Sequence, residues 1–267
     1  MSPRRRTGQR QHAPFRGGIA VAFAAVALAS AALVAGLVLW GLSSGGGSTA
    51  APKTAAIVDQ LSLTQPNPDF AQAATNILED AGYSVDYYAG EAVTVEFYRE
   101  LPTHEYDLLI MRVHSGLARD NGKPTDYVSL FTGEPFSETF HDTATFEDAE
   151  AGRLGRARSY EGGDEYYGIV PAFIESSMRG TFQDATVILM GCDGLITNAA
   201  AEAFVSKGAK TVVGWSGRVS AEHTDAAAEH LLRHLLADGL TTQGAVARTM
   251  AEVGPDPTYG STLLYYP

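Results

Sequence analysis

The stretch TVILMGCDGLITNAAAEAFVSKGAKTVVGW, residues 186–215, decides the fold that the sequence predicts. Two apolar runs, 186–190 and 210–215, enclose an Ala-rich segment, 197–207, whose apolar spacing is that of an amphipathic helix leading to Gly208. Apolar runs of this kind are typical of parallel strands that are covered on both faces. A strand, a helix and a second strand in this order predict a parallel unit with a right-handed crossover.

The same alternation continues on both sides of this unit. Residues 53–267 are therefore predicted to form an α/β domain with a mostly parallel central sheet. A polar, Gly-rich segment, 117–167, breaks the alternation, and we interpret it as an insertion that carries one hairpin around Tyr127–Phe131. The other expected strands cover 55–61, 83–88 and 106–113, and the other expected helices cover 70–81, 93–101, 222–236 and 243–253.

Residues 1–52 differ in composition from the predicted domain. A basic tail, 1–18, precedes an uncharged apolar run, 19–42, and a Gly/Ser-rich stretch, 43–52, has the composition of a flexible linker. At about 1.5 Å per residue, a helix over the apolar run spans the roughly 30 Å hydrocarbon layer. Because the arginines precede the run, we expect a single-pass signal anchor with a cytoplasmic N-terminus and the main domain outside the cytoplasm. A cleaved signal peptide is the alternative, although the run exceeds the usual apolar region of such a peptide.

Composition and charge exclude several classes of protein. The 267 residues are 45% hydrophobic and 19% charged and include a single cysteine, which excludes a wholly disordered chain, a disulfide-stapled small protein and a Cys-ligated zinc module. Residues 1–42 hold five arginines and no acidic residue, so the remainder carries 14 basic and 31 acidic groups, a net charge of −17. Such a surface repels phosphate backbones, and we therefore expect no nucleic-acid partner.

Two predicted strands are followed by residues that together can do chemistry. His114 follows the strand 106–113, and Cys192, the only cysteine, follows the strand 186–190. Reactive groups gather at the carboxyl ends of parallel strands, and side chains on neighbouring strands come within reach of each other. An imidazole beside a thiol can take its proton, and the resulting thiolate attacks a carbonyl carbon.

The surroundings of this pair suit the same chemistry. A tight turn at Gly116 and the backbone N–H of Cys192 are candidate donors to an oxyanion, and a helix that begins near Thr197 would favour the thiolate through its dipole. The alternative interpretation is structural, since a free cysteine at a strand end usually packs in the core. With seven histidines in the chain, a neighbouring His114 can also arise by chance.

The order of these segments resembles the caspase–gingipain superfamily of cysteine peptidases, which includes the CHAT domains. The shared order is an apolar strand, a His near a Gly, a second apolar strand, Gly-Cys, a helix and a further strand. Residues 204–215 (FVSKGAKTVVGW) are similar to the strand that follows the Cys-bearing helix of the family, and residues 230–250 resemble the helices that close CHAT and gingipain-like domains. The resemblance covers residues 55–253.

This resemblance implies a caspase-like three-layer α/β sandwich with endopeptidase activity. It makes Cys192 the nucleophile and His114 the general base, with Gly116 and the N–H of Cys192 in the oxyanion hole. The family forms its primary specificity pocket where the strand after the Cys helix ends, which here is Trp215, Ser216 and Gly217. Within the family the His is usually followed directly by Gly, whereas Ser115 intervenes here, and Asp193 places a negative charge beside Cys192.

Three further groups each have two interpretations. Arg112, near the end of an apolar strand, is either a cation of the substrate pocket or the partner of an acidic residue. Trp215 either lines the substrate pocket or packs in the core. His223, His230 and His234 share one predicted helix but lack the HExxH pattern, so an exposed polar helix face is favoured over a metal site, and neither a metal nor a cofactor is expected.

The sequence thus predicts a membrane-anchored, caspase-like cysteine endopeptidase that acts outside the cytoplasm on protein or peptide substrates. A second hypothesis is a catalytically silent caspase-like domain, tethered to the membrane, that binds partners through residues 117–167. A third is a periplasmic-type α/β domain that binds a small molecule at the strand rim without covalent chemistry. Rapid alkylation of Cys192 that depends on His114 distinguishes the first hypothesis from the other two.

Overall fold

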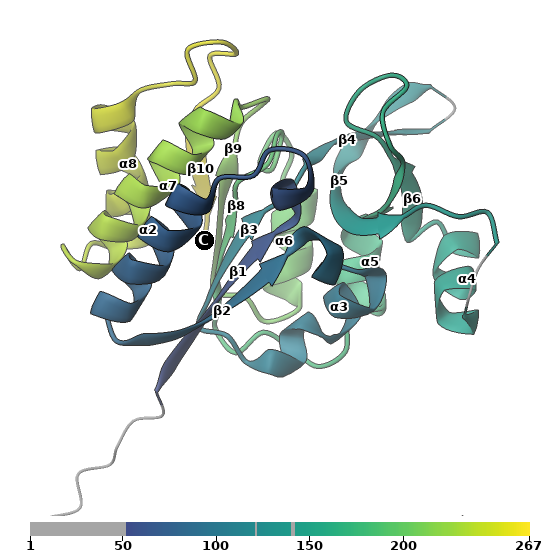
Figure 1. Cartoon of the computed structure of the whole chain (residues 1–267), viewed down its shortest axis with the longest axis horizontal. Helices are drawn as coiled ribbons and strands as arrows, with labels where there is room; N and C mark the ends of the chain where they lie inside the picture. Colours follow the sequence, from purple (N-terminus) through teal and green to yellow (C-terminus); the bar gives the residue numbers. More distant parts are fainter. Residues whose placement is uncertain (1–51, 121, 140–141) are drawn as a thin grey trace, which may run out of the picture. The chain divides into compact units, whose positions relative to one another are not determined.

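A six-stranded sheet forms the centre of the computed structural model, which describes residues 52–120, 122–139 and 142–267 (Figure 1). The strand order is β10-β9-β8-β3-β1-β2, and all neighbours run parallel except β10, which is antiparallel to β9. The strands of this sheet are β1 (Lys53–Asp59), β2 (Tyr83–Ala89), β3 (Leu108–Arg112), β8 (Thr186–Leu189), β9 (Thr211–Trp215) and β10 (Leu263–Tyr266). The predicted α/β class with a mostly parallel sheet is therefore confirmed.

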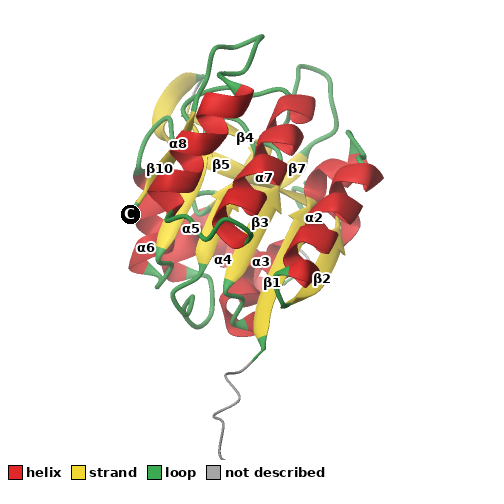
Figure 2. Ribbon diagram, turned by 90° about the vertical axis from the view of Figure 1, so that its left-hand side faces the viewer, coloured by secondary structure: helices red, strands yellow, loops and turns green. Residues whose placement is uncertain are grey.

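Helices cover both faces of this sheet. One face carries α2 (Pro68–Asp80), α7 (Ala221–Leu236) and α8 (Thr242–Val253), which lie in front of the strands in Figure 2. The other face carries α3 (Val95–Glu100), α5 (Pro171–Ser176) and α6 (Ala199–Ser206). Three short 3-10 helices complete the layers: η1 (Gln60–Leu63) follows β1, η2 (Gly90–Ala92) follows β2 and η3 (Leu101–His104) follows α3.

Burial on both faces explains the unbroken apolar runs of the central strands. In β1, Ala55 and Ile57 pack against the α2/α7/α8 layer, whereas Ala56 and Val58 pack against the opposite layer. All five residues of β3 are buried, and they alternate between the two layers in the same way. Such runs form strands because their apolar side chains are removed from water on either side of the sheet.

The segment between β3 and β8 forms a second, antiparallel sheet of order β4-β5-β7-β6. It is built from β4 (Ser115–Asp120), β5 (Lys123–Pro135), β6 (Leu154–Ala157) and β7 (Tyr166–Ile169), with α4 (Thr143–Glu150) between β5 and β6. The prediction of a single hairpin around Tyr127–Phe131 is wrong, because these residues lie inside β5. Their alternation reflects one buried face of this larger sheet, since Val128 and Leu130 pack into the main core and the half-buried Ser129 separates them.

Two further elements have no counterpart among the predicted ones. The strand β10 pairs with β9 along the edge of the main sheet, with Leu263 opposite Trp215. The helix α5 begins at Pro171, where the fixed φ of proline suits a first helical turn, and it buries Phe173 and Ile174. Both segments are short, so their apolar residues show too few periods to reveal a strand or a helix from sequence alone.

The predicted tail, anchor and most of the linker, residues 1–51, lie outside the residues that the structure describes. The predicted span 19–42 therefore stays a prediction. Among the helices that the structure does describe, none combines the length and the apolar character that crossing a bilayer requires.

Candidate functional site: Cys192, His114 and the strand rim

The two sequence segments that carry the candidate nucleophile and base meet at one rim of the sheet. β3 and β8 are parallel neighbours, with Met111 paired to Leu189, and their carboxyl ends lead into His114 and Cys192. The hydroxyl of Ser115 donates to the carbonyl oxygen of Cys192 at 2.7 Å, which joins the two segments directly. The rim thus holds the two residues in adjacent chain segments, because the two strands are neighbours in the sheet.

A glycine makes this close approach feasible. A Cβ atom at Gly191 would overlap both the carbonyl oxygen of Val113 and the hydroxyl of Ser115. Only a residue without a side chain therefore lets the Gly191–Cys192 backbone lie against the segment that carries His114. Gly191 is itself buried, so neither backbone has free space into which it can move.

His114 is half-buried and is held by the residues that follow β1. Its backbone N–H donates to Gln60 Oε1 at 2.9 Å, and its Nε2 lies 3.0 Å from the hydroxyl of Thr64. The imidazole also contacts the Phe131 ring, with 5.6 Å between ring centroids. Burial lowers the pKa of His114, and the neighbouring Arg112 cation lowers it further, because both disfavour a charged imidazolium. The imidazole is therefore neutral at pH 7 and has a lone pair available for a proton.

Cys192 is also half-buried, and its thiol is held by the loop that follows β9. Its Sγ lies 3.5 Å from both the carbonyl oxygen and the backbone nitrogen of Val219. Burial raises the pKa of the thiol, while the N–H of Val219 lowers it and the nearby Asp193 carboxylate raises it. The expected stabilisation of a thiolate by a following helix is not seen, since α6 starts only at Ala199 and the net direction is toward the neutral thiol.

The thiol and the imidazole make their hydrogen bonds in opposite directions along the sheet. Thr64 follows β1, which lies beyond β3, whereas Val219 follows β9, which lies beyond β8. Within the part of the chain that the structure describes, no hydrogen bond joins Cys192 Sγ to His114. The rim therefore holds a neutral thiol and a neutral base in adjacent segments, each fixed by a partner of its own.

The candidate oxyanion residue lies in a strand and not in a tight turn. Gly116 belongs to β4 and pairs with Ser129 of β5. The carboxylate of Asp193 reaches this strand, because its Oδ2 accepts a hydrogen bond of 3.4 Å from the N–H of Leu117. A negative group thus lies next to the place where the resemblance puts the oxyanion. The expected turn at Gly116 is wrong, because Ser115 starts a strand that continues into the second sheet.

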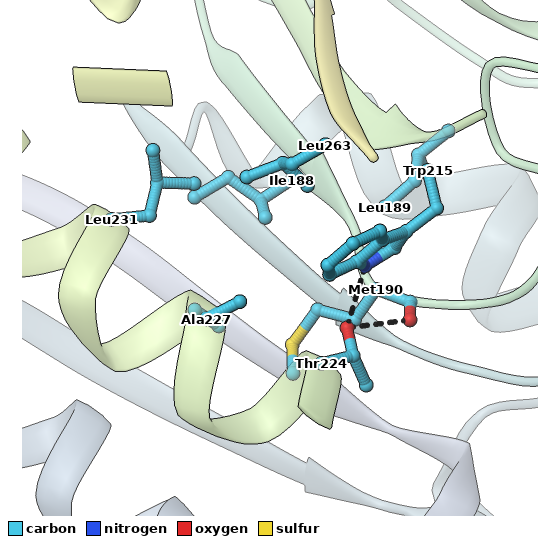
Figure 3. Close-up of a pocket in the computed structure, with 9 residues that line it drawn as sticks. Ile188, Leu189, Met190, Trp215, Thr224, Ala227, Leu231 and Leu263 are labelled. Carbon is cyan, nitrogen blue, oxygen red and sulfur yellow. Dashed lines mark hydrogen bonds between the residues drawn. The ribbon is translucent and has the colours of Figure 1, made fainter. Parts of the chain in front are cut away.

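Of the residues expected to form a substrate pocket, Trp215 packs in the core. Its side chain is 1% exposed, and its Nε1 donates to the hydroxyl of Thr224, which in turn donates to the Met190 carbonyl (Figure 3). The small cavity beside the indole has a volume of about 10 Å³ and is lined mainly by apolar side chains. That is room for one water molecule and not for a substrate side chain. Of the two interpretations of Trp215, packing in the core is therefore the one that the structure has.

Ser216 and Gly217 connect the Cys192 loop to the rest of the sheet. The N–H of Asp193 donates to the carbonyl oxygen of Gly217 at 2.8 Å, and the N–H of Ser216 donates to Thr262 at 2.9 Å. Both residues are half-buried. The bond between Asp193 and Gly217 therefore keeps this segment close to the loop that carries Cys192. The resemblance places the start of the specificity pocket at this segment.

Arg112 is ion-paired, which is the second of its two interpretations. It is 1% exposed and forms a bidentate pair with Asp225 of α7, with distances of 2.8 and 2.9 Å. A third bond of 2.8 Å goes to Asp59 at the end of β1, and a fourth goes to the carbonyl oxygen of Gln65. Its guanidinium therefore holds β1, β3 and α7 together close to His114 in the chain.

Sequence reasoning missed the residues that fix the two candidate groups. Gln60 and Thr64 hold His114, and Val219 holds the thiol. Gln60 and Thr64 could have been found from the sequence, because they follow β1, the strand next to β3. Residues that follow neighbouring parallel strands lie at the same rim of the sheet. The side-chain nitrogen of Gln60 is buried without a hydrogen-bond partner among the described residues, which makes this amide the least satisfied polar group beside His114.

Comparisons with known proteins do not place this chain in a family. No protein-family model matches the sequence, and no curated protein sequence matches it. The function is therefore argued from the rim itself.

Proposed function

We propose that this chain is a caspase-like cysteine peptidase whose nucleophile is Cys192 and whose general base is His114. The observation that carries the proposal is the hydrogen bond of 2.7 Å from Ser115 to Cys192, which ties the His-bearing end of β3 to the Cys-bearing end of β8. The caspase–gingipain resemblance requires this juxtaposition, with the two residues on adjacent parallel strands.

The proposed reaction is acyl transfer. The imidazole of His114 takes the thiol proton, the sulfur of Cys192 bonds to the peptide carbonyl carbon, and the protonated imidazole then gives its proton to the leaving amine. Water hydrolyses the resulting thioester and restores the thiol. For the first step, the thiol exchanges its contact with Val219 for one with the imidazole, and His114 releases Thr64. Catalytic hydrogen bonds of this kind are often formed only when substrate is bound.

Backbone strain next to the nucleophile supports a functional loop. Asp193 has a φ of 61°, a left-handed conformation that residues with a side chain rarely adopt. Such residues gather at active sites, where the surrounding structure holds them in place. Here the hydrogen bond from Asp193 N–H to Gly217 and the bond from Leu117 N–H to the carboxylate hold the turn that presents Cys192.

A catalytically silent domain is the second candidate, and two observations favour it. The pKa of Cys192 is raised, so the thiol is protonated at neutral pH, and the Asp193 carboxylate lies beside the expected oxyanion position. In that case Ser115, Gly191 and Cys192 serve to lock the two strand ends together. The two candidates make opposite predictions for the reactivity of the thiol.

Alkylation of Cys192 by iodoacetamide at pH 7 tests the proposal. We expect the wild-type chain to react at least about tenfold faster than His114→Ala, because a general base contributes about 10²-fold or more to such steps. The rate should level off above the pKa of His114, which burial places below its usual value. Since Cys192 is the only cysteine, the labelled fraction measured by mass spectrometry reports this residue alone.

The exposed histidine of η3 provides the matched control. His104 precedes β3, whereas His114 follows it, so His104→Ala removes an imidazole at the opposite end of the strand and should leave the rate unchanged. Thermal unfolding of each variant checks that the fold is retained. A slow reaction, equal in wild type and His114→Ala, that rises about tenfold per pH unit below the raised thiol pKa would reject the peptidase and support the silent domain.

We further propose that the domain lies outside the cytoplasm, anchored by residues 19–42. The test uses the variant Glu79→Cys, which places a cysteine at an exposed position of α2, in a Cys192→Ser background. A membrane-impermeant maleimide should label this cysteine in intact cells. Labelling of permeabilised cells gives the total amount of the variant for comparison. Labelling that appears only after permeabilisation would contradict the proposed orientation, which rests on the five arginines before the apolar run.

A further inference from the structure

A cluster of two histidines and a glutamate joins α7 to α8. His230 and His234 are four residues apart on α7 and so share one face of the helix, and Glu252 is on α8. One oxygen of the glutamate, Oε2, lies 3.0 Å from His230 Nδ1 and 3.0 Å from His234 Nε2. The three ligand atoms all lie within 4.8 Å of one another.

We propose that His230, His234 and Glu252 form a zinc-binding site that fastens α7 to α8. Two imidazole nitrogens and a carboxylate oxygen are a common set of protein ligands for Zn²⁺, with water as the fourth ligand. Around a tetrahedral ion with bonds of about 2.0–2.1 Å, ligand atoms are about 3.3 Å apart. The two contacts of 3.0 Å to Glu252 therefore need to open by a few tenths of an ångström, and the two imidazole nitrogens, which lie within 4.8 Å of each other, need to take the same spacing.

The two carboxylates around His234 favour a positive charge at its ring. This side chain is 9% exposed and has a carboxylate at each ring nitrogen, with Asp238 Oδ2 at 2.7 Å from Nδ1 and Glu252 Oε2 at 3.0 Å from Nε2. A neutral imidazole has one N–H and so can donate to only one of them. When Nδ1–H donates to Asp238, the lone pair of Nε2 faces the Glu252 carboxylate, and a positive group at Nε2, either a proton or a metal ion, removes the repulsion.

The residues that contact the proposed ligands are arranged as they are around many metal sites. Histidine ligands of zinc usually donate their other N–H to a carboxylate, which is the position of Asp238. Glu252 is fixed in turn, because its second oxygen accepts from Arg248 Nε at 2.7 Å. His230 is 47% exposed, which gives an ion access from solvent.

Titration of the full-length chain with Zn²⁺ alone, followed by calorimetry, tests this site. We expect one equivalent to bind, with the affinity lowered at least about tenfold in His234→Ala and in Glu252→Gln. Asp238→Asn, which changes the partner of His234 Nδ1, should lower it about 10- to 100-fold. Co²⁺ in place of Zn²⁺ should give the visible absorption of a tetrahedral complex. Zinc should also raise the melting temperature of the wild-type chain, and a chelator should reverse this rise.

Two controls separate this site from the rim. His104→Ala removes an exposed histidine elsewhere, and Cys192→Ser removes the thiol, so both should bind zinc as the wild-type chain does. Failure of the wild-type chain to bind, or equal affinity in His234→Ala and wild type, would overturn the proposal. Loss of binding in Cys192→Ser would overturn it as well, because the ion would then belong to the rim.

Discussion

Replacing Arg112 by leucine should lower the free energy of unfolding by about 3–5 kcal/mol, because it removes one partner of a buried ion pair. The guanidinium is 1% exposed, and its partners Asp59 and Asp225 are 1% and 4% exposed. Without the cation, two carboxylates remain in the interior between β1 and α7 with no positive charge beside them. Desolvation of those charges, more than the lost contact itself, sets the size of the effect.

Urea unfolding of Arg112→Leu measures this loss. Arg179→Leu is the matched control, because Arg179 pairs with Glu96 and Glu100 on the surface and is 51% exposed, so its loss should cost at most about 1 kcal/mol. Arg112→Lys should fall between the two, since it keeps the charge but not the bidentate geometry with Asp225. A loss below about 1 kcal/mol in Arg112→Leu would mean that the two carboxylates find another partner or become protonated.

The second large effect is expected at Asp256, which lies in the connection between α8 and β10. Its side chain is 2% exposed and accepts four hydrogen bonds, from the N–H and the hydroxyl of Ser220 and from the N–H groups of Thr258 and Tyr259. Asp256→Ala leaves these donors without their acceptor, one of them at the N-cap residue of α7. We expect the free energy of unfolding to fall by about 2–4 kcal/mol at pH 7.

The contribution of Asp256 should depend on pH in a defined direction. Burial raises its pKa, but the hydrogen bonds from Ser220, Tyr259 and Thr258 outweigh burial and bring the pKa to about 2. The folded-state pKa is thus below the unfolded value of about 3.9, so the stabilisation is fully present above the unfolded pKa and is lost as the pH falls toward 2.

Unfolding of wild type and Asp256→Ala between pH 7 and pH 2 should therefore show two curves that approach each other in acid. Asp80→Asn, at an exposed position of α2, should leave stability within about 0.5 kcal/mol at every pH. A difference between wild type and Asp256→Ala that stays constant down to pH 2 would show that packing, and not the ionised carboxylate, provides the stabilisation.

The central sheet could be predicted from sequence because its strands are buried on both faces. Runs such as Leu108–Arg112 and Thr211–Trp215 are uniformly apolar or buried and are separated by amphipathic helices, so their class and their order along the chain are clear. The second sheet gave no such signal, since residues 115–118 of β4 are half-buried without alternation and β5 alternates over only part of its length. Its strands depend on pairing with one another, and pairing is not visible in a single sequence.

The candidate site could be predicted as a location but not as an arrangement of bonds. Parallel strands with His114 and Cys192 at their ends had to share a rim if the strands were neighbours. Which way each side chain turns depends on Thr64 and Val219, residues on loops whose positions follow from tertiary packing. The same limit applies to His234, where the expected exposed polar face is wrong because α8 packs across it.

His114 lies in the two-residue passage between the parallel sheet and the antiparallel one, since β3 ends at Arg112 and β4 begins at Ser115. Arg112 is clamped by its carboxylates, so the chain on one side of the passage is stationary. On the other side, the N–H of Phe131 in β5 donates to the carbonyl oxygen of His114 at 2.9 Å. The backbone that carries the candidate base is therefore fixed by both sheets at once, so the geometry of the rim depends on how the antiparallel sheet folds.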